Sequence, residues 1–129
     1  MLNVKTWIWT HLKNDATLTS LVPVASMGQA YPDAMINCPK IGFIENGQPA
    51  APDAYGDNQP FGYETTIEVH VFVTKQSNTQ FQIVNALDAI FLGLFFTITF
   101  SSDVPEPDSR LLHRIIRYRR KVIASDLLT

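Results

Sequence analysis

Residues 63–91 constrain the fold more than any other stretch, because a pattern with a period of two runs directly into one with the period of a helix. Alternate residues form a dry face, composed of Tyr63, Thr65, Ile67, Val69, Val71 and Val73. The residues between them form a mixed face, composed of Glu64, Thr66, Glu68, His70, Phe72 and Thr74. This alternation predicts a long strand that buries one side.

The second part, residues 78–91, has the spacing of an amphipathic helix. Its apolar residues recur at three- and four-residue steps, at Phe81, Val84, Leu87 and Ile90 or Phe91. The run from Ser77 to Gln80 matches a capping box, and Gly93 suits the helix end, where a left-handed residue is favoured. We predict that this helix packs on the dry face of the strand.

Further elements flank this pair. Asn3 is a predicted cap for a helix in which Val4, Ile8 and Leu12 share a face with Trp7 beside them, and residues 16–22 predict a short helical turn that ends at Pro23. Strands are predicted over residues 26–31, 40–45, 95–101 and 110–123. In the third of these strands the alternation places Phe96, Ile98 and Phe100 on one face.

These elements predict an α+β fold in a single small domain that spans residues 1–129. We expect a mixed or antiparallel sheet of four to five strands, with two main helices packed on one face, in the order α-β-β-β-α-β-β. A chain of 129 residues suits one compact core. Its composition, 46% hydrophobic and only 17% charged, suggests that some apolar surface faces a partner.

The sequence predicts a soluble protein made in the cytoplasm. Cys38 is the one cysteine, so no disulfide forms within the chain, and the default compartment is reducing. The first ten residues lack the basic start and apolar run of a signal peptide, and Lys5 interrupts them. The longest apolar cluster, residues 89–96, is much shorter than the ~20 residues that a membrane span needs.

Charge is distributed unevenly along the chain. The net formal charge is -2, but residues 110–129 carry +5 and residues 1–109 carry -7. The basic candidates for a protein interface or a channel are Arg110, Arg114, Arg117, Arg119, Arg120 and Lys121. Three interpretations remain open: contact with acidic patches on other protein copies, contact with DNA phosphates, or arginines solvated on a wet sheet face.

Residues 46–62 are rich in glycine, proline, asparagine and aspartate, which predicts a long loop rather than a regular element. Loops of about 15 residues are uncommon inside a compact domain, and many are functional. The candidate partner-contact residues are Asn46, Gln48, Asp53, Tyr55, Asp57 and Phe61. The alternative is a mobile connection with no role in the free protein.

We identify no catalytic, metal or cofactor site and predict that the protein is not an enzyme. His11, His70 and His113 lack the paired spacing of metal ligands and are interpreted as surface or half-buried residues, and Cys38 as an inert thiol. Glu64 and Glu68 are four residues apart on one strand face, roughly 13 Å, which is too far to share a proton. We interpret them as cross-strand partners of the arginines.

The layout resembles the tail completion, or tail terminator, proteins of long-tailed bacteriophages and related prophages. The resemblance covers nearly the whole chain. It is carried by the N-terminal helix, the run Asn14-Asp-Ala-Thr-Leu-Thr-Ser-Leu-Val22, the Tyr31-Pro32 step and the strand Pro39-Lys-Ile-Gly-Phe-Ile44. It continues through Glu68-Val-His-Val-Phe72, the following helix and the arginine-rich closing strand.

This resemblance implies a virion protein that forms a ring, commonly a hexamer, at the head-proximal end of the tail tube. Such a ring terminates tail polymerisation and joins the tail to the head connector or stopper protein, so the implied partners are copies of itself, the tube protein and the connector. DNA then passes through the channel without sequence-specific binding. The arginines would line either a subunit interface or that channel. The alternatives are another neck component, such as a head completion or stopper protein, and a small nucleic-acid-binding protein that uses the basic strand.

Overall fold

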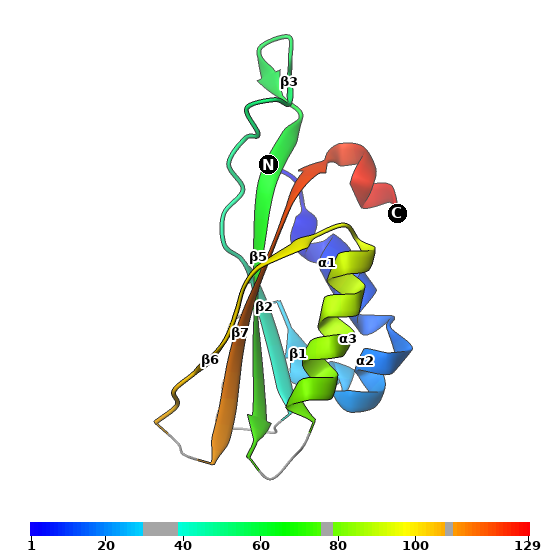
Figure 1. Cartoon of the computed structure of the whole chain (residues 1–129). Helices are drawn as coiled ribbons and strands as arrows, with labels where there is room; N and C mark the ends of the chain where they lie inside the picture. Colours follow the sequence, from blue (N-terminus) through cyan, green and yellow to red (C-terminus); the bar gives the residue numbers. More distant parts are fainter. Residues whose placement is uncertain (30–38, 76–78, 108–109) are drawn as a thin grey trace.

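The structure, a computed structural model, describes residues 1–29, 39–75, 79–107 and 110–129. Within these ranges the chain folds into an α+β arrangement in which the helices lie on one side of a twisted sheet (Figure 1). The strand order in the main sheet is β1-β2-β5-β7-β6. Its strands are β1 (Met27–Gly28), β2 (Lys40–Glu45), β5 (Gly62–Thr74), β6 (Thr97–Val104) and β7 (Leu111–Ile123). The β1–β2 pair is parallel and the other pairs are antiparallel, so the predicted mixed sheet with helices on one face is confirmed.

The N-terminal helices begin where the sequence predicts. In α1 (Val4–Lys13) the Asn3 side chain accepts a hydrogen bond from the Thr6 N–H, and Val4, Trp7, Ile8 and Leu12 are buried. In α2 (Ala16–Leu21) the Asp15 side chain accepts from the Leu18 N–H, and the chain is already extended at Val22, before Pro23. Short 3-10 turns follow at η1 (Val24–Ser26) and, after β7, at η2 (Ala124–Leu128).

The dry face of β5 forms the centre of the core, as predicted. Its residues from Thr65 to Val73 on that face are fully buried, and they pack with apolar residues of α1, α3 and β7. The helix α3 (Gln80–Gly93) contributes Phe91, whose ring stacks on Tyr118 of β7 at 3.9 Å between centroids. The Tyr118 hydroxyl donates to Asp88 (2.6 Å), which satisfies the polar end of a buried ring.

The predicted apolar face of α3 is wrong at its first member. Ile83, Ala86, Leu87 and Phe91 are the buried residues, whereas Phe81 is 75% exposed. The helix begins at Gln80 with Thr79 as its N-cap, and Thr79 makes no capping hydrogen bond through its side chain. The predicted Ser77 cap lies outside the described residues. The stripe that meets the sheet is therefore rotated toward Ile83, and Phe81 faces solvent.

The end of α3 also departs from the prediction. The helix ends at Gly93, but the left-handed residue is Phe95, with φ of 66°. The Phe96 N–H donates to the Phe91 carbonyl (2.9 Å) and the Phe95 N–H to the Leu92 carbonyl (3.0 Å). This is the Schellman arrangement, with Phe95 at the position that glycine usually occupies. The chain therefore holds an aromatic residue in a conformation that bulky side chains rarely adopt.

The strand β6 contains an irregularity that the alternation does not reveal. Ile98 pairs with Tyr118 and Phe100 pairs with Arg117, so the register shifts between them. Because Tyr118 and Arg117 point to opposite sides of the sheet, Ile98 and Phe100 also lie on opposite faces, contrary to the prediction. Phe100 instead receives the Arg117 guanidinium at 4.8 Å from its ring centroid.

Residues 46–62 are more regular than predicted. The Asn46 and Glu64 N–H groups donate to the Thr66 and Pro49 carbonyls respectively, so the segment follows β5. A two-stranded hairpin, β3 (Tyr55–Gly56) with β4 (Gln59–Pro60), then projects past the end of the main sheet (Figure 1). Asp57 and Asn58 both have positive φ, which is the backbone of a two-residue hairpin turn that these residue types tolerate.

The remaining sequence predictions agree with the structure at the level of elements. The predicted strand over residues 26–31 is represented by β1, and its last two residues, 30 and 31, lie outside the described part of the chain. The final strand begins at Leu111, one residue later than predicted. Among the described residues, none of the helices has the length and hydrophobicity needed to cross a bilayer.

Candidate protein-interaction face

The side of the main sheet opposite the helices is the strongest candidate for a functional surface. It is formed by the mixed face of β5 and by the residues of β7 that alternate with its buried ones, and no helix of the described residues covers it (Figure 1). We call it the helix-free face. It carries Glu64, Glu68 and His70 from β5, and His113, Arg117, Arg119 and Lys121 from β7.

The basic residues of the C-terminal strand divide between the two sides of the sheet. Arg114 and Arg120 point to the helix side, because they lie at steps of two from the core residues Ile116, Tyr118 and Val122 and so share their face of the strand. Arg114 Nη1 contacts Asp103 (3.1 Å), and Arg120 Nη2 contacts Asp126 (2.9 Å). Arg120 also donates to the Leu94 carbonyl (2.9 Å). These two residues therefore do not form a patch with Arg117 and Arg119.

The other three basic residues of β7 lie on the helix-free face, each opposite an acid from the earlier part of the chain. Arg117 Nε contacts Glu68 at 2.8 Å, and Arg119 Nε contacts Glu64 at 3.6 Å. The interpretation of the two glutamates as cross-strand partners of arginines is confirmed. Lys121 donates to Asp53 (2.8 Å), a contact that raises the pKa of Lys121 and lowers that of Asp53.

Pairing within the chain therefore occupies much of the basic strand. Arg119 remains 54% exposed at its side chain despite its contact with Glu64. Arg110 precedes β7, is exposed, and accepts a hydrogen bond at its carbonyl from the Lys75 N–H (2.8 Å). The charge difference between the two parts of the sequence is thus partly neutralised where β5 meets β7, and less of it is available to an outside partner.

A chain of polar contacts runs along the helix-free face from Glu68 to Glu106. His70 Nε2 lies 3.0 Å from Glu68, His70 Nδ1 lies 2.8 Å from His113 Nε2, and His113 Nδ1 lies 2.6 Å from Glu106. His70 and His113 are only 2% and 3% exposed, so the prediction of surface or half-buried residues is wrong for both. His11, by contrast, is half-buried. The two rings can be buried because their nitrogens lie close to polar partners. The Phe72 ring also stacks on the His113 ring, with 4.1 Å between the centroids.

This geometry constrains the hydrogen bonds of the two rings. Each outer ring nitrogen, His70 Nε2 and His113 Nδ1, faces a carboxylate and is best used as a donor. The inner nitrogens lie 2.8 Å apart, within hydrogen-bonding distance of each other. Burial and the neighbouring charge of His70 hold the pKa of His113 below its usual value.

Glu68 connects the histidine pair to Arg117. Burial raises the pKa of Glu68, but its hydrogen bonds to Arg117 and His70 outweigh that effect and leave the pKa below the usual value. One Glu68 oxygen accepts from Arg117 Nε (2.8 Å), and the other lies 3.0 Å from His70 Nε2. Both oxygens of this buried carboxylate therefore have a partner, which is the condition for a stable buried network.

The loop candidates separate into anchoring and exposed residues. Gln48 bonds Leu2 and Glu45, Asp53 bonds Lys121, and the Asn46 backbone bonds β5, so these residues fix the segment to the domain. The other three candidates, Tyr55, Asp57 and Phe61, are exposed on or next to the projecting hairpin. The structure thus identifies residues 52–61 as an arm with a fixed base and an exposed tip.

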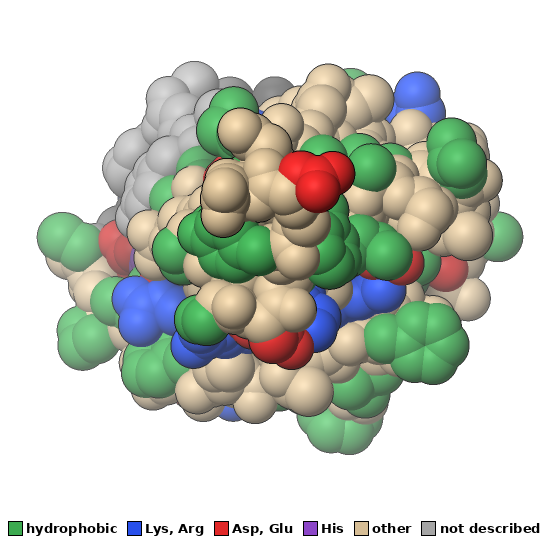
Figure 2. All heavy atoms as spheres, turned by 90° about the horizontal axis from the view of Figure 1, so that it is seen from above, with side chains coloured by type: hydrophobic (Ala, Val, Ile, Leu, Met, Phe, Trp, Pro, Cys, Tyr) green, Lys and Arg blue, Asp and Glu red, His purple; other side chains and the backbone are tan. Residues whose placement is uncertain are grey.

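The end of the molecule that carries this arm has a distinctive surface. Figure 2 shows Lys and Arg side chains gathered in a band across it, with hydrophobic side chains on both sides. Exposed hydrophobic residues that sequence reasoning did not select include Leu92 and Phe95, at the end of α3. Phe95 was missed because the nearby Gly93 was the expected residue for the helix end, and its left-handed conformation is visible only in the backbone.

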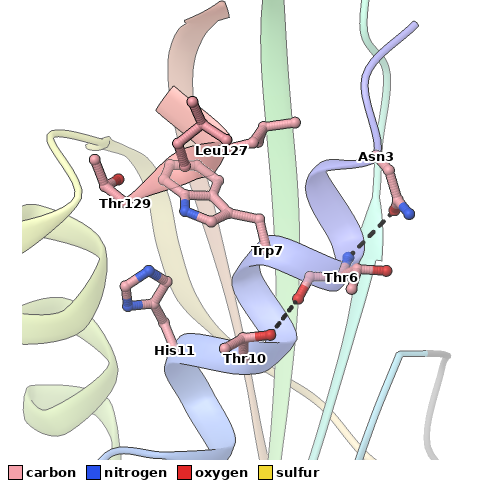
Figure 3. A pocket seen from close by; sticks show the side chains of 8 residues that line it. Asn3, Thr6, Trp7, Thr10, His11, Leu127 and Thr129 are labelled. Atoms are coloured by element: carbon pink, nitrogen blue, oxygen red, sulfur yellow. Dashed lines mark hydrogen bonds between the residues drawn. The ribbon is translucent and has the colours of Figure 1, made fainter. Parts of the chain in front are cut away.

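A small pocket of about 280 Å³ lies between α1 and η2. Figure 3 shows Trp7 pointing from α1 toward Leu127, with His11 and Thr129 near the same opening. The Thr10 hydroxyl donates to the Thr6 carbonyl, whereas the buried Trp7 Nε1 has no hydrogen-bond partner among the described residues. No aspartate or glutamate is among the residues that line this pocket.

Metal-ligating side chains do not gather elsewhere in the described ranges. No group of three or more His, Cys, Asp or Glu in those residues has the geometry to hold a metal ion. The two buried histidines use their inner nitrogens on each other, and a metal ion would have to break that contact.

Comparison with known proteins extends these observations at the level of fold. No protein-family model matches the chain, and no curated protein matches it. A solved structure does match: a chain of the "Virion of native gene transfer agent (GTA) particle", with a TM-score of 0.66 and 13% sequence identity. The alignment covers 94% of this chain and 95% of that chain, so the two share their fold from end to end.

Proposed function

We propose that this protein is a structural virion protein that forms a ring at the head-proximal end of a phage-type tail tube. The ring terminates tube polymerisation and joins the tail to the head connector. The observation that carries the proposal is the fold shared with a chain of a gene transfer agent virion, at 94% and 95% coverage. A match of whole chains supports one assembly unit per polypeptide, and so a single tail-terminator-like domain over residues 1–129.

The surfaces of the chain support a role in assembly rather than catalysis. One face of the sheet is free of helices among the described residues, and an arm with exposed aromatic residues projects beyond the sheet. Repeated copies that each offer a projecting arm and partly exposed residues of the helix-free face are suited to head-to-tail contacts, which close into a ring when the rotation allows it. We therefore propose a structural and not an enzymatic function, with the protein located in the virion at the head-tail junction.

The experiment is a polymerisation assay with a purified tail-tube protein. Adding the purified chain during tube growth should give tubes of limited length with an added ring at one end, measured by negative-stain electron microscopy. Size-exclusion chromatography with light scattering should show a ring, expected to be a hexamer, either free or bound to tubes. Tubes of unchanged length, with no chain bound at either end, would overturn the proposal.

Another neck component, such as a head completion or stopper protein, is the second candidate, because the fold match is to a chain of a whole virion particle and specifies no position within it. The terminator and stopper functions are distinguished by the partner that the protein binds first. A terminator binds tube ends before any head is present, whereas a stopper binds heads that lack tails. Co-sedimentation with purified tubes and with purified tailless heads distinguishes these outcomes.

A nucleic-acid-binding role for the basic strand has less support. Arg114, Arg117, Arg119, Arg120 and Lys121 each contact an acid of the same chain. Phosphates would have to compete with these carboxylates. A salt titration with random duplex DNA tests the point, since binding through phosphates is strongest at low salt.

A further inference from the structure

We propose that Phe95 is the anchor through which one copy of this chain binds the arm, residues 52–61, of the next copy. The inference deepens the proposed function and rests on it, since it names the surfaces that would hold the ring together. It starts from two exposed features at the same end of the molecule, the end of α3 and the β3–β4 hairpin (Figure 1). Neither feature is used by the core.

The conformation of Phe95 is the first observation. The residue is 78% exposed and occupies the left-handed region with φ of 66°, in a position where glycine is preferred. Neither exposure nor this backbone helps the isolated domain, because an exposed ring gains little burial and a bulky residue is strained there. A strained residue of this kind at the surface points to a role outside the monomer.

The surroundings of Phe95 supply a cation and an aliphatic side chain. The Arg120 guanidinium lies 5.9 Å from the Phe95 ring centroid and is itself fixed by Asp126 (2.9 Å) and the Leu94 carbonyl (2.9 Å). Leu92, one turn earlier in α3, is also exposed. An exposed aromatic side chain beside a cation and an aliphatic group has the character of an interface anchor.

The arm has complementary chemistry. Tyr55 and Phe61 are each 52% exposed, and residues 52–61 contain two aspartates and no lysine or arginine. The arm therefore offers two aromatic rings with Asp57 at its turn, since Asp53 is already paired with Lys121. Phe95 instead lies beside the Arg120 guanidinium, and Lys and Arg side chains form a band across this end (Figure 2). Opposite charge with matching apolar surface selects the arm as the occupant of the Phe95 site.

The contact must form between copies. The base of the arm is fixed to its own domain, where Ala51 and Ala54 are buried, Lys121 binds Asp53, and a Cβ on Gly62 would lie 2.7 Å from Ala54. A hairpin held in this way cannot fold back onto α3 of the same chain. Each copy thus offers one arm and one anchor, which is a heterologous contact that propagates from copy to copy.

The test uses two complementary variants and a control. Phe95→Gly removes the anchor and relieves the backbone, while the pair Tyr55→Ser and Phe61→Ser weakens the arm. Phe81→Ser is the matched control, since Phe81 is also about three quarters exposed but lies at the other end of α3. Analytical ultracentrifugation over a concentration series measures self-association, and thermal unfolding measures the stability of each variant.

The expected result has three parts. Phe95→Gly melts at an equal or higher temperature than the unmodified chain but self-associates at least about tenfold more weakly, and the arm variant also self-associates weakly. The Phe81→Ser control self-associates normally. A mixture of the Phe95→Gly and arm variants forms a one-to-one dimer, because one intact anchor then meets one intact arm and no further copy can join.

Two results would overturn the contact. One is normal self-association of Phe95→Gly, and the other is a mixture of the two variants that stays monomeric. If the unmodified chain is monomeric on its own, the same variants are compared in the tube assay. There, Phe95→Gly should fail to assemble a ring on the tubes. Loss of the contact with intact capping of tubes would leave the proposed function standing, whereas failure of the unmodified chain to cap tubes would remove both.

Discussion

The two faces of β5 are both buried over much of their length, but by different chemistry. On one face, Ile67, Val69 and Val71 pack against helices, and their burial depends on shape and apolar area. On the other, Glu68 and His70 are buried because each polar atom meets a partner across the sheet. The apolar face tolerates any partner of the right size, whereas the polar face requires one register between β5 and β7.

The two faces of β5 therefore have different structural roles. The apolar face determines that the helices pack on the sheet, and the polar face determines how β5 aligns with β7. A slip of one residue would leave Glu68 opposite an apolar residue and leave the histidine pair unmatched. The polar side of β5 is therefore buried without a helix over it among the described residues.

The largest expected effect comes from placing a charge on the apolar face. Val69→Asp should destabilise the domain by about 4 kcal/mol or more, because the carboxylate would be buried without a partner. Thr66→Asp is the matched control on the other face of the same strand, where the residue pairs with Arg119, and it should change stability by less than about 1 kcal/mol. Chemical denaturation measures both, and equal losses would show that the two faces do not differ as described.

The next effect tests the polar network. Glu68→Ala removes the carboxylate that faces both Arg117 and His70 and should cost about 2–3 kcal/mol, because it leaves a buried imidazole without its acceptor. The measurement is the free energy of unfolding in urea at pH 7. A loss below about 0.5 kcal/mol would mean that the network contributes little, and that the apolar face alone stabilises the sheet.

Part of this contrast was predictable from the sequence and part was not. The alternation of residues 63–74 predicted the strand and its dry face, since a period of two is a local property that survives in the fold. The pairing of Glu64 and Glu68 with arginines also followed, because opposite charges on neighbouring strands attract. The contact of His70 with His113 did not, because it depends on the register of two strands that are far apart in the sequence.

The other differences have a common origin in backbone geometry. The β6 irregularity that reverses Phe100, the left-handed Phe95 and the Asp57-Asn58 hairpin turn each change the direction of the chain at one or two residues. The local sequence carries only general signals at these points. Gly93 indicated a helix end two residues before the left-handed Phe95, and the composition of residues 46–62 indicated a loop without specifying the hairpin. The surface candidates that depend on such points, above all Phe95, therefore become visible only in the structure.

The pH dependence offers a sharper test of the polar face. The pKa of His113 is lowered in the folded protein, so the unfolded chain binds more protons below the usual value of 6.5, and stability falls as pH falls through that range. Glu68, whose pKa is lowered from 4.5, adds a further loss at more acidic pH. The free energy of unfolding should decline between pH 7.5 and 5.5 for the unmodified protein. It should decline less for His113→Gln, even though that variant is less stable at every pH. Parallel curves would contradict the role given to His113.

The smallest expected effect compares two ion pairs on the helix-free face. Glu64 and Arg119 are separated by 3.6 Å and both are more exposed than Glu68 and Arg117, which are separated by 2.8 Å. A double-mutant cycle to alanine should therefore give a coupling of about 0.5 kcal/mol or less for the first pair, falling further with added salt, and a larger one for the second. If the two couplings are equal, burial does not determine the strength of the pairs along this face. The expected weak coupling between Glu64 and Arg119 would mean that breaking this pair costs the fold little stability. Arg119 could then contact an acid on another molecule in place of Glu64.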